Sequence, residues 1–244
     1  MFFGMIKYHW LVLLREPINL FFGFGLPFLQ LFLSFNQIRE YEIVGQVMAN
    51  AMPVFTIVAA MVLCFTDSGL SHAYTRQIKF LRRLRMTPVK PMHYIATGIL
   101  SRIAVLIVFA ATFIAFCATM FDMYVPAINN TIWPIFIGVL LLAFIMLYLI
   151  AMFLANLLNN AKASQGLIFV VFFTMLLLGG FMIGTGGFPD ILQTVSNWLP
   201  STFAITSLQA AWVGGDLFYG HYFWAMLGSI VVFALLSIKF FKYE

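Results

Sequence analysis

A cluster of basic side chains is the part of this sequence whose residue types and spacing could serve a chemical purpose. Six of the 13 lysine and arginine residues fall within the segment "RQIKFLRRLRMTPVKP", namely Arg76, Lys79, Arg82, Arg83, Arg85 and Lys90. Ile78, Leu81 and Leu84 recur among them at three-residue intervals, which is typical of an amphipathic helix. Pro88 and Pro91 should stop this helix, because proline disfavours helix in the residue before it. The basic face could hold anionic lipid headgroups, and the apolar face could dock onto a partner protein.

The residue patterns needed for catalysis or metal binding are missing from the sequence. It contains no G-x-x-x-x-G-K-[ST] phosphate loop, no H-E-x-x-H metal motif and no G-x-S-x-G nucleophile turn. The four histidines are scattered, at His9, His72, His93 and His221. Cys64 and Cys117 both lie in apolar runs, where a free cysteine behaves as a small buried hydrophobe. We therefore predict that the chain is not an enzyme, binds no cofactor or metal, and depends on another polypeptide for any ATP hydrolysis.

The composition requires a bilayer around the elements that position this basic segment. The chain is 63% hydrophobic and only 9% charged, with a mean hydropathy of +1.01, whereas a soluble domain is about 25% charged. The net charge of +5 would suggest a nucleic-acid partner only if it formed a basic face on a soluble fold. Membrane topology explains these charges better, so we predict a lipid partner and no nucleic acid.

The intervals without charged residues predict an all-α membrane protein with a single transmembrane domain over 1–244. Six helices should cross the bilayer, at 18–37, 46–66, 93–120, 132–155, 165–184 and 218–238. An interfacial helix is predicted over 1–16 because aromatic and basic residues mix there. The predicted cytoplasmic coupling loop is 67–92. A seventh apolar interval is interrupted by polar residues and Pro200, so we interpret 185–216 as an extracellular re-entrant segment made of short helices.

The distribution of basic residues predicts that both termini are cytoplasmic. With six spans, 12 of the 13 lysines and arginines lie inside and only Arg39 lies outside, as the positive-inside rule requires. Arg102 is counted inside because its side chain should extend from the third span to the cytoplasmic interface. No Asp or Glu falls in the middle of a predicted span, which argues against an ion-coupled carrier. The expected location is the plasma membrane of a bacterium.

Three segments of the chain resemble the membrane subunits of ABC-2-type exporters. The family's loop after the second span commonly reads R-E-x-G-T-L-E-R-L-R-V-T-P-V, which is matched here by Arg76, Leu81, Arg83, Leu84, Arg85, Thr87, Pro88 and Val89. The N-terminal segment is similar through Arg15, Pro17 and Pro27. The segment before the last span is similar through Gly180, Phe188, Pro189, Trp198, Leu199 and Pro200. The resemblance covers nearly the whole chain.

This resemblance implies that the chain is half of a transporter. It would pair with a second membrane subunit, identical or different, and with two cytoplasmic ABC ATPase subunits that bind the ATP and Mg. The residues that would contact the ATPase are Arg76, Gln77, Phe80, Leu81, Arg83, Leu84, Thr87 and Pro88. Gln77 stands where the family usually has Glu, so a salt bridge at this position is replaced by a hydrogen bond, or the chain is the degenerate half of a heterodimer.

The resemblance also implies a substrate path between the two membrane subunits, lined by the first, second and fifth spans. Candidate lining residues are Phe28, Gln30, Ser34, Asn50, Phe55, Thr56, Phe173 and Thr174. Candidate residues of an outer gate are Gly180, Gly184, Phe188, Pro189, Trp198 and Pro200. The aromatic character of the path favours export of a drug, an antimicrobial peptide or a lipid-like molecule. The alternatives are a lipid-linked polysaccharide or teichoic acid exporter and a non-transport immunity or sensor protein.

Overall fold

All the regular secondary structure in the part of the chain that the structure describes is helical. The computed structural model describes residues 2–15, 21, 25, 27–29, 31–32, 44–80, 91–120, 132–179, 189–218 and 220–241. Its helices are α1 (Phe2–Arg15), α3 (Val44–Val62), the π-helix η1 (Leu63–Gly69), α4 (Leu70–Gln77), α6 (Pro91–Met120), α7 (Ile132–Leu157), α8 (Ala161–Leu178), α9 (Asp190–Asn197), α10 (Pro200–Val213) and α11 (Tyr222–Lys239). A helix satisfies its own backbone hydrogen bonds, which is what a chain of this composition needs in hydrocarbon.

Four of the described helical stretches are long and apolar enough to cross a membrane. They are Ala51–Gln77, Pro91–Met120, Trp133–Leu157 and Tyr222–Lys239, and the shorter apolar helix Lys162–Leu178 accompanies them. The prediction of an all-helical membrane protein is therefore confirmed. The first predicted span, 18–37, lies largely outside the described residues, so the count of six spans stays a prediction.

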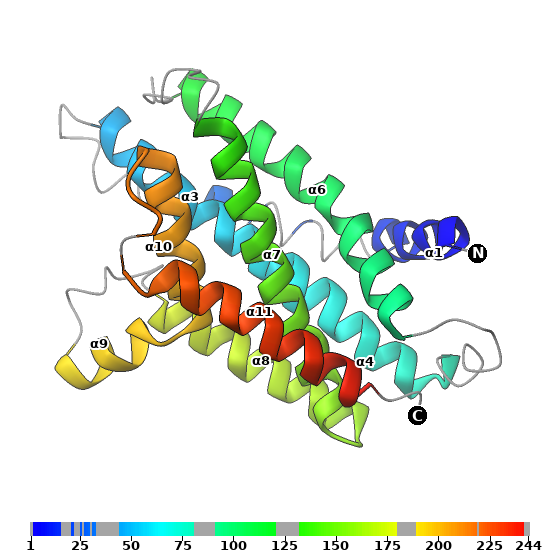
Figure 1. The fold of residues 1–244 in the computed structure, drawn as a ribbon. Helices are drawn as coiled ribbons and strands as arrows, with labels where there is room; N and C mark the ends of the chain where they lie inside the picture. Colours follow the sequence, from blue (N-terminus) through cyan, green and yellow to red (C-terminus); the bar gives the residue numbers. More distant parts are fainter. Residues whose placement is uncertain are drawn as a thin grey trace.

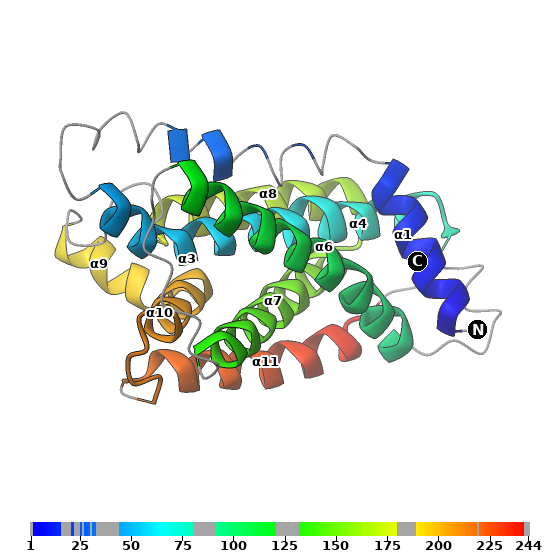
Figure 2. The same ribbon diagram turned by 90° about the horizontal axis from the view of Figure 1, so that it is seen from above.

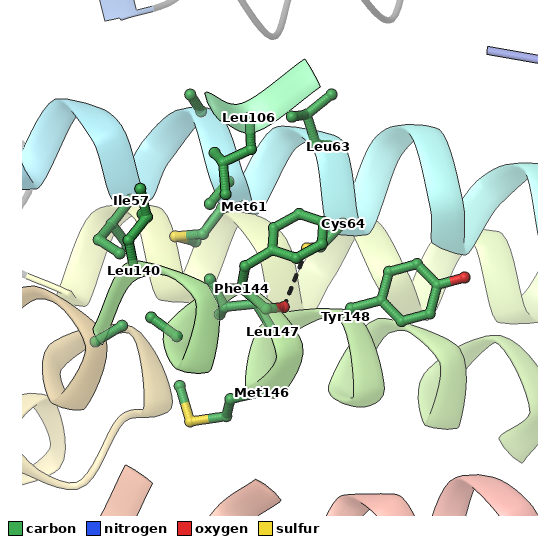
Figure 3. Packing of buried hydrophobic residues seen from close by; sticks show 14 of the residues in the cluster. Ile57, Met61, Leu63, Cys64, Leu106, Leu140, Phe144, Met146, Leu147 and Tyr148 are labelled. Carbon is green, nitrogen blue, oxygen red and sulfur yellow. Dashed lines mark hydrogen bonds between the residues drawn. The ribbon is translucent and has the colours of Figure 1, made fainter. Parts of the chain in front are cut away.

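Helix α7 forms the centre of the bundle (Figure 1), in contact with α3, η1, α8, α10 and α11. Figure 3 shows Phe144 of α7 facing side chains of neighbouring helices, such as Met61 and Leu106, all of them fully buried. The thiol of Cys64 donates to the backbone oxygen of Phe144 at 3.7 Å. Cys64 and Cys117 are both buried free thiols, as predicted.

Different helices lie at the two ends of the bundle. Helix α1 and the last turns of α4 and α11 lie at one end, whereas α9 and the start of α11 lie at the other (Figure 1). Helix α1 lies across the end of α6 instead of running along the bundle (Figure 2). Its buried side chains Met5, His9 and Leu13 recur every four residues, so one stripe of α1 faces the bundle.

The helix that contains the second predicted span continues well beyond its predicted end at residue 66. Helix α3 passes through η1 into α4 without interruption, and α4 ends at Gln77. Arg76 therefore belongs to the end of this long helix and does not begin a separate amphipathic one. Lys79 then adopts a left-handed conformation with φ of 57°. The remainder of the basic segment, 81–90, lies outside the described residues.

The polar interval before the last span contains the two short helices expected there, and their extracellular re-entrant placement stays a prediction. Helix α9 ends at Asn197 and α10 begins at Pro200. Proline suits the first position of a helix because the amide hydrogen it lacks would have no partner there. Helix α10 packs against α3, α7 and α11, which buries Phe203, Leu208 and Trp212.

Candidate functional site

A cluster of buried polar side chains lies where α1, η1, α4, α6 and α7 meet. The polar cluster consists of His9, Asp67, His72, Tyr94, Arg102, Tyr148 and Asn156, none of which is more than 4% exposed. Several of them, with Ser68, Ser71 and Thr75, line a small cavity, with room for about one water molecule. Burying so many polar groups costs free energy unless they pair with one another, so their mutual contacts define the site.

An ion pair forms the charged part of the polar cluster. Arg102 Nε donates to Asp67 Oδ2 at 2.5 Å, and both side chains are almost fully buried. The guanidinium also donates to the backbone oxygen of Gly98 at 3.4 Å and to Ser101 Oγ at 3.3 Å. The prediction that Arg102 extends to the cytoplasmic interface is therefore wrong. The sequence pattern places Asp67 in a loop. In the structure the helix continues through η1, so the carboxylate lies inside the bundle, next to Arg102.

The π-helical segment places this carboxylate. In η1 the hydroxyl of Ser68 donates to the backbone oxygen of Leu63, five residues earlier, at 3.0 Å. A π turn rotates the side chains that follow it relative to an α-helix, and such turns are frequent at functional sites. Asp67 Oδ1 has no hydrogen-bond partner within the described part of the chain, so the pairing with Arg102 is what offsets the burial of this carboxylate.

Hydrogen bonds from His72 join three helices at the polar cluster. His72 Nε2 lies 3.1 Å from Asn156 Oδ1 on α7, and Nδ1 lies 3.4 Å from the Tyr94 hydroxyl on α6. An amide oxygen only accepts, so Nε2 carries the proton and Nδ1 accepts from Tyr94. Sequence reasoning missed this site because it treated the histidines as scattered. The spacing of Ser68, Ser71, His72 and Thr75 along one helical face was the available signal.

His9 attaches α1 to the polar cluster. Its Nδ1 lies 3.5 Å from Nη1 of Arg102, and its ring packs edge-on against that of Tyr94 with centroids 4.9 Å apart. Burial removes the imidazolium from water and the Arg102 guanidinium repels it, so the pKa of His9 falls from 6.5 to about 3. His9 is therefore neutral at physiological pH, and it accepts from Arg102 through Nδ1.

Acidification should weaken the attachment of α1 through His9. A lowered pKa contributes stability that is fully present above the ordinary value of 6.5 and is lost as the pH falls towards the folded value of about 3. Between pH 7.5 and 4.5 this loss amounts to about 2–3 kcal/mol for one such group. We expect the melting temperature of the native chain in detergent to fall further over this interval than that of His9→Gln. If the melting temperatures of both proteins fell equally, the pKa of His9 would not differ between the folded and unfolded states.

Arg76 faces the interior of the protein at the end of α4. Its guanidinium donates to the backbone oxygens of Ala155 at 2.5 Å, Leu158 at 3.1 Å and Asn159 at 3.4 Å. These carbonyls belong to the C-terminal end of α7 and the turn after it, where backbone oxygens lack partners within the helix. Arg76 therefore ties the start of the basic segment to the turn between α7 and α8.

Two other predicted ATPase-contact residues, Gln77 and Phe80, lie within the described part of the chain and differ in their exposure. Gln77 is exposed. Phe80 is half-buried, and its ring stacks on that of Tyr8 in α1 with centroids 5.0 Å apart. Leu81, Arg83, Leu84, Thr87 and Pro88 lie outside the described residues. The described part of the basic segment thus presents Gln77 outward and is held in place by Arg76 and Phe80.

The structure brings together only some of the predicted substrate-path residues. Phe28 and Phe55 both pack against Phe113 of α6, with ring centroids 5.1 and 5.6 Å away. Thr56, which follows Phe55, is fully buried, and its hydroxyl donates to the backbone oxygen of Met52 at 3.0 Å. Phe173 and Thr174 lie instead on the exposed side of α8. Gln30, Ser34 and the side chain of Asn50 lie outside the described residues.

The predicted gate residues are described only in part. Pro189 and Trp198 are exposed at either end of α9, and Pro200 begins α10. Gly180, Gly184 and Phe188 lie outside the described residues. Within the described ranges, no group of three or more His, Cys, Asp or Glu side chains could hold a metal ion.

Comparison with known protein families identifies a match over most of the chain. The sequence model of the family described as "ABC-2 type transporter" matches residues 2–213 of the chain. The match includes α1, the polar cluster, the basic segment and all of α10. No protein of curated function matches the chain.

Proposed function

Because the chain belongs to the ABC-2 type transporter family, we propose that it forms one half of an ATP-driven exporter for hydrophobic or amphipathic molecules. The chain is a multi-pass membrane subunit and not an enzyme, since the family domain is a permease without an ATPase domain. ABC-2 permeases generally pair with ABC ATPase subunits. Two such ATPases, which bind ATP and Mg, and a second membrane subunit complete the proposed transporter.

The attachment of α4 and of the start of the basic segment to three other parts of the bundle is the observation that carries this proposal. Arg76 binds the turn after α7, Phe80 stacks on α1, and the ring of His72 in α4 lies 5.5 Å from that of Phe241 after α11. An ATPase that pulled on the basic segment would therefore move α4 together with α1 and the ends of α7 and α11. The exposed side chain of Gln77 is available for the contact.

Mutation of the apolar side of the basic segment should separate docking from simple charge anchoring. The double variant Leu81→Ser, Leu84→Ser keeps every basic residue, so its insertion and its attraction to anionic lipids should not change. Burying one leucine contributes about 1.5–3 kcal/mol, so loss of both should weaken ATPase binding by a few kcal/mol. We expect co-purification of the ATPase and substrate-stimulated hydrolysis to be lost.

The matched control for this experiment is Leu157→Ser, Leu158→Ser, because both leucines are exposed at the end of α7, in the neighbouring turn. Unchanged ATPase binding in the Leu81→Ser, Leu84→Ser protein would reduce the segment to a lipid anchor and remove the proposed coupling.

The proposed orientation places the termini and the basic segment in the cytoplasm and α9 outside. Lys162 and Asp190 are both exposed, Lys162 at the start of α8 and Asp190 beyond its end. In intact cells, a membrane-impermeant thiol reagent should label Asp190→Cys and should not label Lys162→Cys until the cells are opened. The native thiols Cys64 and Cys117 are buried, so labelling of the native chain measures the background. The reverse pattern would invert the topology.

The interior aromatic side chains support an apolar or amphipathic substrate. Phe28, Phe109 and Phe113 form a contiguous group, to which Phe55 is joined through Phe113. A path that opened along these buried side chains would accommodate apolar groups without requiring a charge on the substrate. A lipid-linked polysaccharide or teichoic acid is the second candidate, because its lipid portion presents the same chemistry. The family match favours either exporter over a non-transport immunity or sensor protein.

A further inference from the structure

The small cavity in the polar cluster lies between α1 and the long helix that ends with α4. Its walls come from α1, η1, α4, α6 and α7, and it has room for about one water molecule. Helix α1 packs chiefly on α6, within the described part of the chain, and lies across the end of that helix (Figure 2). The occupant of the cavity therefore affects how α1 is joined to η1 and α4.

His9 brings a nitrogen without a hydrogen-bond partner to this cavity. The side chain lines the cavity from α1 and is 3% exposed, and its Nε2 atom has no partner within the described residues. Asp67, Trp133 and Ser207 also carry buried polar atoms without a partner among these residues, but none of the three lines the cavity. An unsatisfied buried polar group costs free energy, and ordered water commonly supplies the partner where a polar cavity has room for it.

The position of Arg102 determines which kind of hydrogen bond Nε2 of His9 can make. Nη1 of Arg102 lies 3.5 Å from His9 Nδ1, and a guanidinium has protons to donate but no acceptor. Nδ1 must accept from Arg102, because a proton on Nδ1 would point at a proton of the guanidinium. The single ring proton of His9 then lies on Nε2. Helix α1 thus presents an N–H donor that needs an acceptor.

The long helix supplies acceptor atoms to the same cavity. Ser68 in η1 and Thr75 in α4 both line it and are buried. Their hydroxyl protons are already used, since Ser68 donates to the backbone oxygen of Leu63 at 3.0 Å and Thr75 to that of His72 at 2.7 Å. A hydroxyl oxygen that donates its proton can still accept. Neither oxygen bonds His9 Nε2 directly, so a molecule that accepts once and donates twice is needed between them.

We propose that the cavity binds one ordered water molecule that bridges α1 to the long helix. The water accepts from His9 Nε2 and donates to the hydroxyl oxygens of Ser68 and Thr75, which gives it about three hydrogen bonds, the usual number for buried water. A water molecule turns to follow its partners, so this bridge tolerates small shifts of α1 against α4 that a direct hydrogen bond would not. The inference rests on the contacts of the polar cluster and not on the proposed transport function.

Nuclear magnetic resonance of the full-length chain, labelled with ¹⁵N-histidine, tests for this water. The chain has four histidines. His93 and His221 are exposed, so their ring protons should exchange too fast to be observed, which leaves the signals of His9 and His72. Loss of one signal in His9→Gln, or of the other in His72→Gln, assigns both. We expect His9 to carry its proton on Nε2 and to receive rotating-frame transfer from the water resonance with the sign of a dipolar contact.

His72 is the matched control in the same spectrum. Its ring lines the same cavity, but its Nε2 proton is donated directly to Asn156 Oδ1 at 3.1 Å. Transfer that was relayed through a neighbouring hydroxyl proton would reach both histidines. We expect the transfer to His72 to be several-fold weaker than the transfer to His9, because only His9 donates to the water.

Filling the cavity shows where the water lies. Val12 lines the cavity from α1, and Val12→Ile adds one methylene group, which takes up about the volume of a water molecule. We expect this variant to lose the transfer to His9 and to keep the signal of His72. Val232→Ile adds the same group at an exposed position of α11 and should change neither.

Four results would overturn the proposal. A proton on Nδ1 of His9 would remove the donor, and a visible Nε2 proton without transfer from water would show a dry cavity. Equal transfer to His9 and His72 would indicate a relay through hydroxyl protons. Transfer that persisted in Val12→Ile would place the water elsewhere. None of these results concerns ATPase docking or transport, so the proposed function would stand or fall separately.

Discussion

Replacement of Gly98 by alanine is expected to separate α6 from α7 and to destabilise the protein severely. A β-carbon built at Gly98 would lie 2.0 Å from the Tyr148 hydroxyl oxygen and 3.0 Å from its ring carbon Cζ. Tyr148 is fully buried, so its ring cannot move aside without displacing the polar cluster. Overpacking of this kind costs about 1–3 kcal/mol and sometimes more, and we expect the upper end because the His9 ring is also 3.5 Å away.

Thermal unfolding in detergent measures this effect, with Gly138→Ala in α7 as the control. A β-carbon at Gly138 would meet nothing within 4 Å, so that substitution should be neutral or stabilise the helix by up to about 1 kcal/mol. Adding Tyr148→Phe to Gly98→Ala removes the nearest atom and should restore part of the lost stability. A Gly98→Ala protein as stable as the native chain would contradict the close packing of α6 on α7.

Loss of one member of the Arg102–Asp67 pair is expected to have a comparable effect. Arg102→Met leaves the Asp67 carboxylate buried without a counter-charge, and breaking a buried pair in this way typically costs about 3–5 kcal/mol. The double variant Asp67→Leu, Arg102→Met replaces both charges by apolar groups, which is often neutral or stabilising. We therefore expect the folded yield in gel filtration to fall for Arg102→Met and to recover in the double variant.

The comparison of single and double variants decides whether the two side chains act as a pair. If Asp67→Leu and Arg102→Met each reduced the folded yield and the double variant reduced it further by their sum, the residues would contribute independently. That result would contradict the direct contact between them. A native-like yield for Arg102→Met alone would mean that its side chain reaches water, as the sequence had suggested.

The membrane-spanning stretches could be predicted from the sequence because the bilayer imposes a simple requirement. Any helix that crosses it needs a long apolar run, and the described helices α6, α7 and α11 coincide closely with such runs. The interruption of the helix before Pro200 could also be predicted, because proline restricts the backbone whatever surrounds it. These features depend on local sequence alone, so no knowledge of neighbouring helices was needed.

The polar cluster could not be predicted because it depends on packing between distant segments. Asp67 and Arg102 are 35 residues apart, and His72 and Asn156 are 84 apart. Each of these side chains, considered alone, resembles a residue at the end of a span. Arg76 is similar, since it counts as cytoplasmic charge in the sequence but binds the end of α7 in the structure. Only the arrangement of the helices distinguishes a buried partner from a solvated charge.

The central claim, that a separate ATPase docks beside the end of α4, is tested most directly by site-specific crosslinking. A photoreactive amino acid is placed at the exposed position Gln77, with the exposed Thr194 of α9 as the control, and membranes that contain the complete transporter are irradiated. We predict an adduct between the Gln77 variant and a polypeptide with a G-x-x-x-x-G-K-[ST] motif, and none from the Thr194 variant. Equal adducts at both positions, or no ATPase adduct at Gln77, would contradict the account.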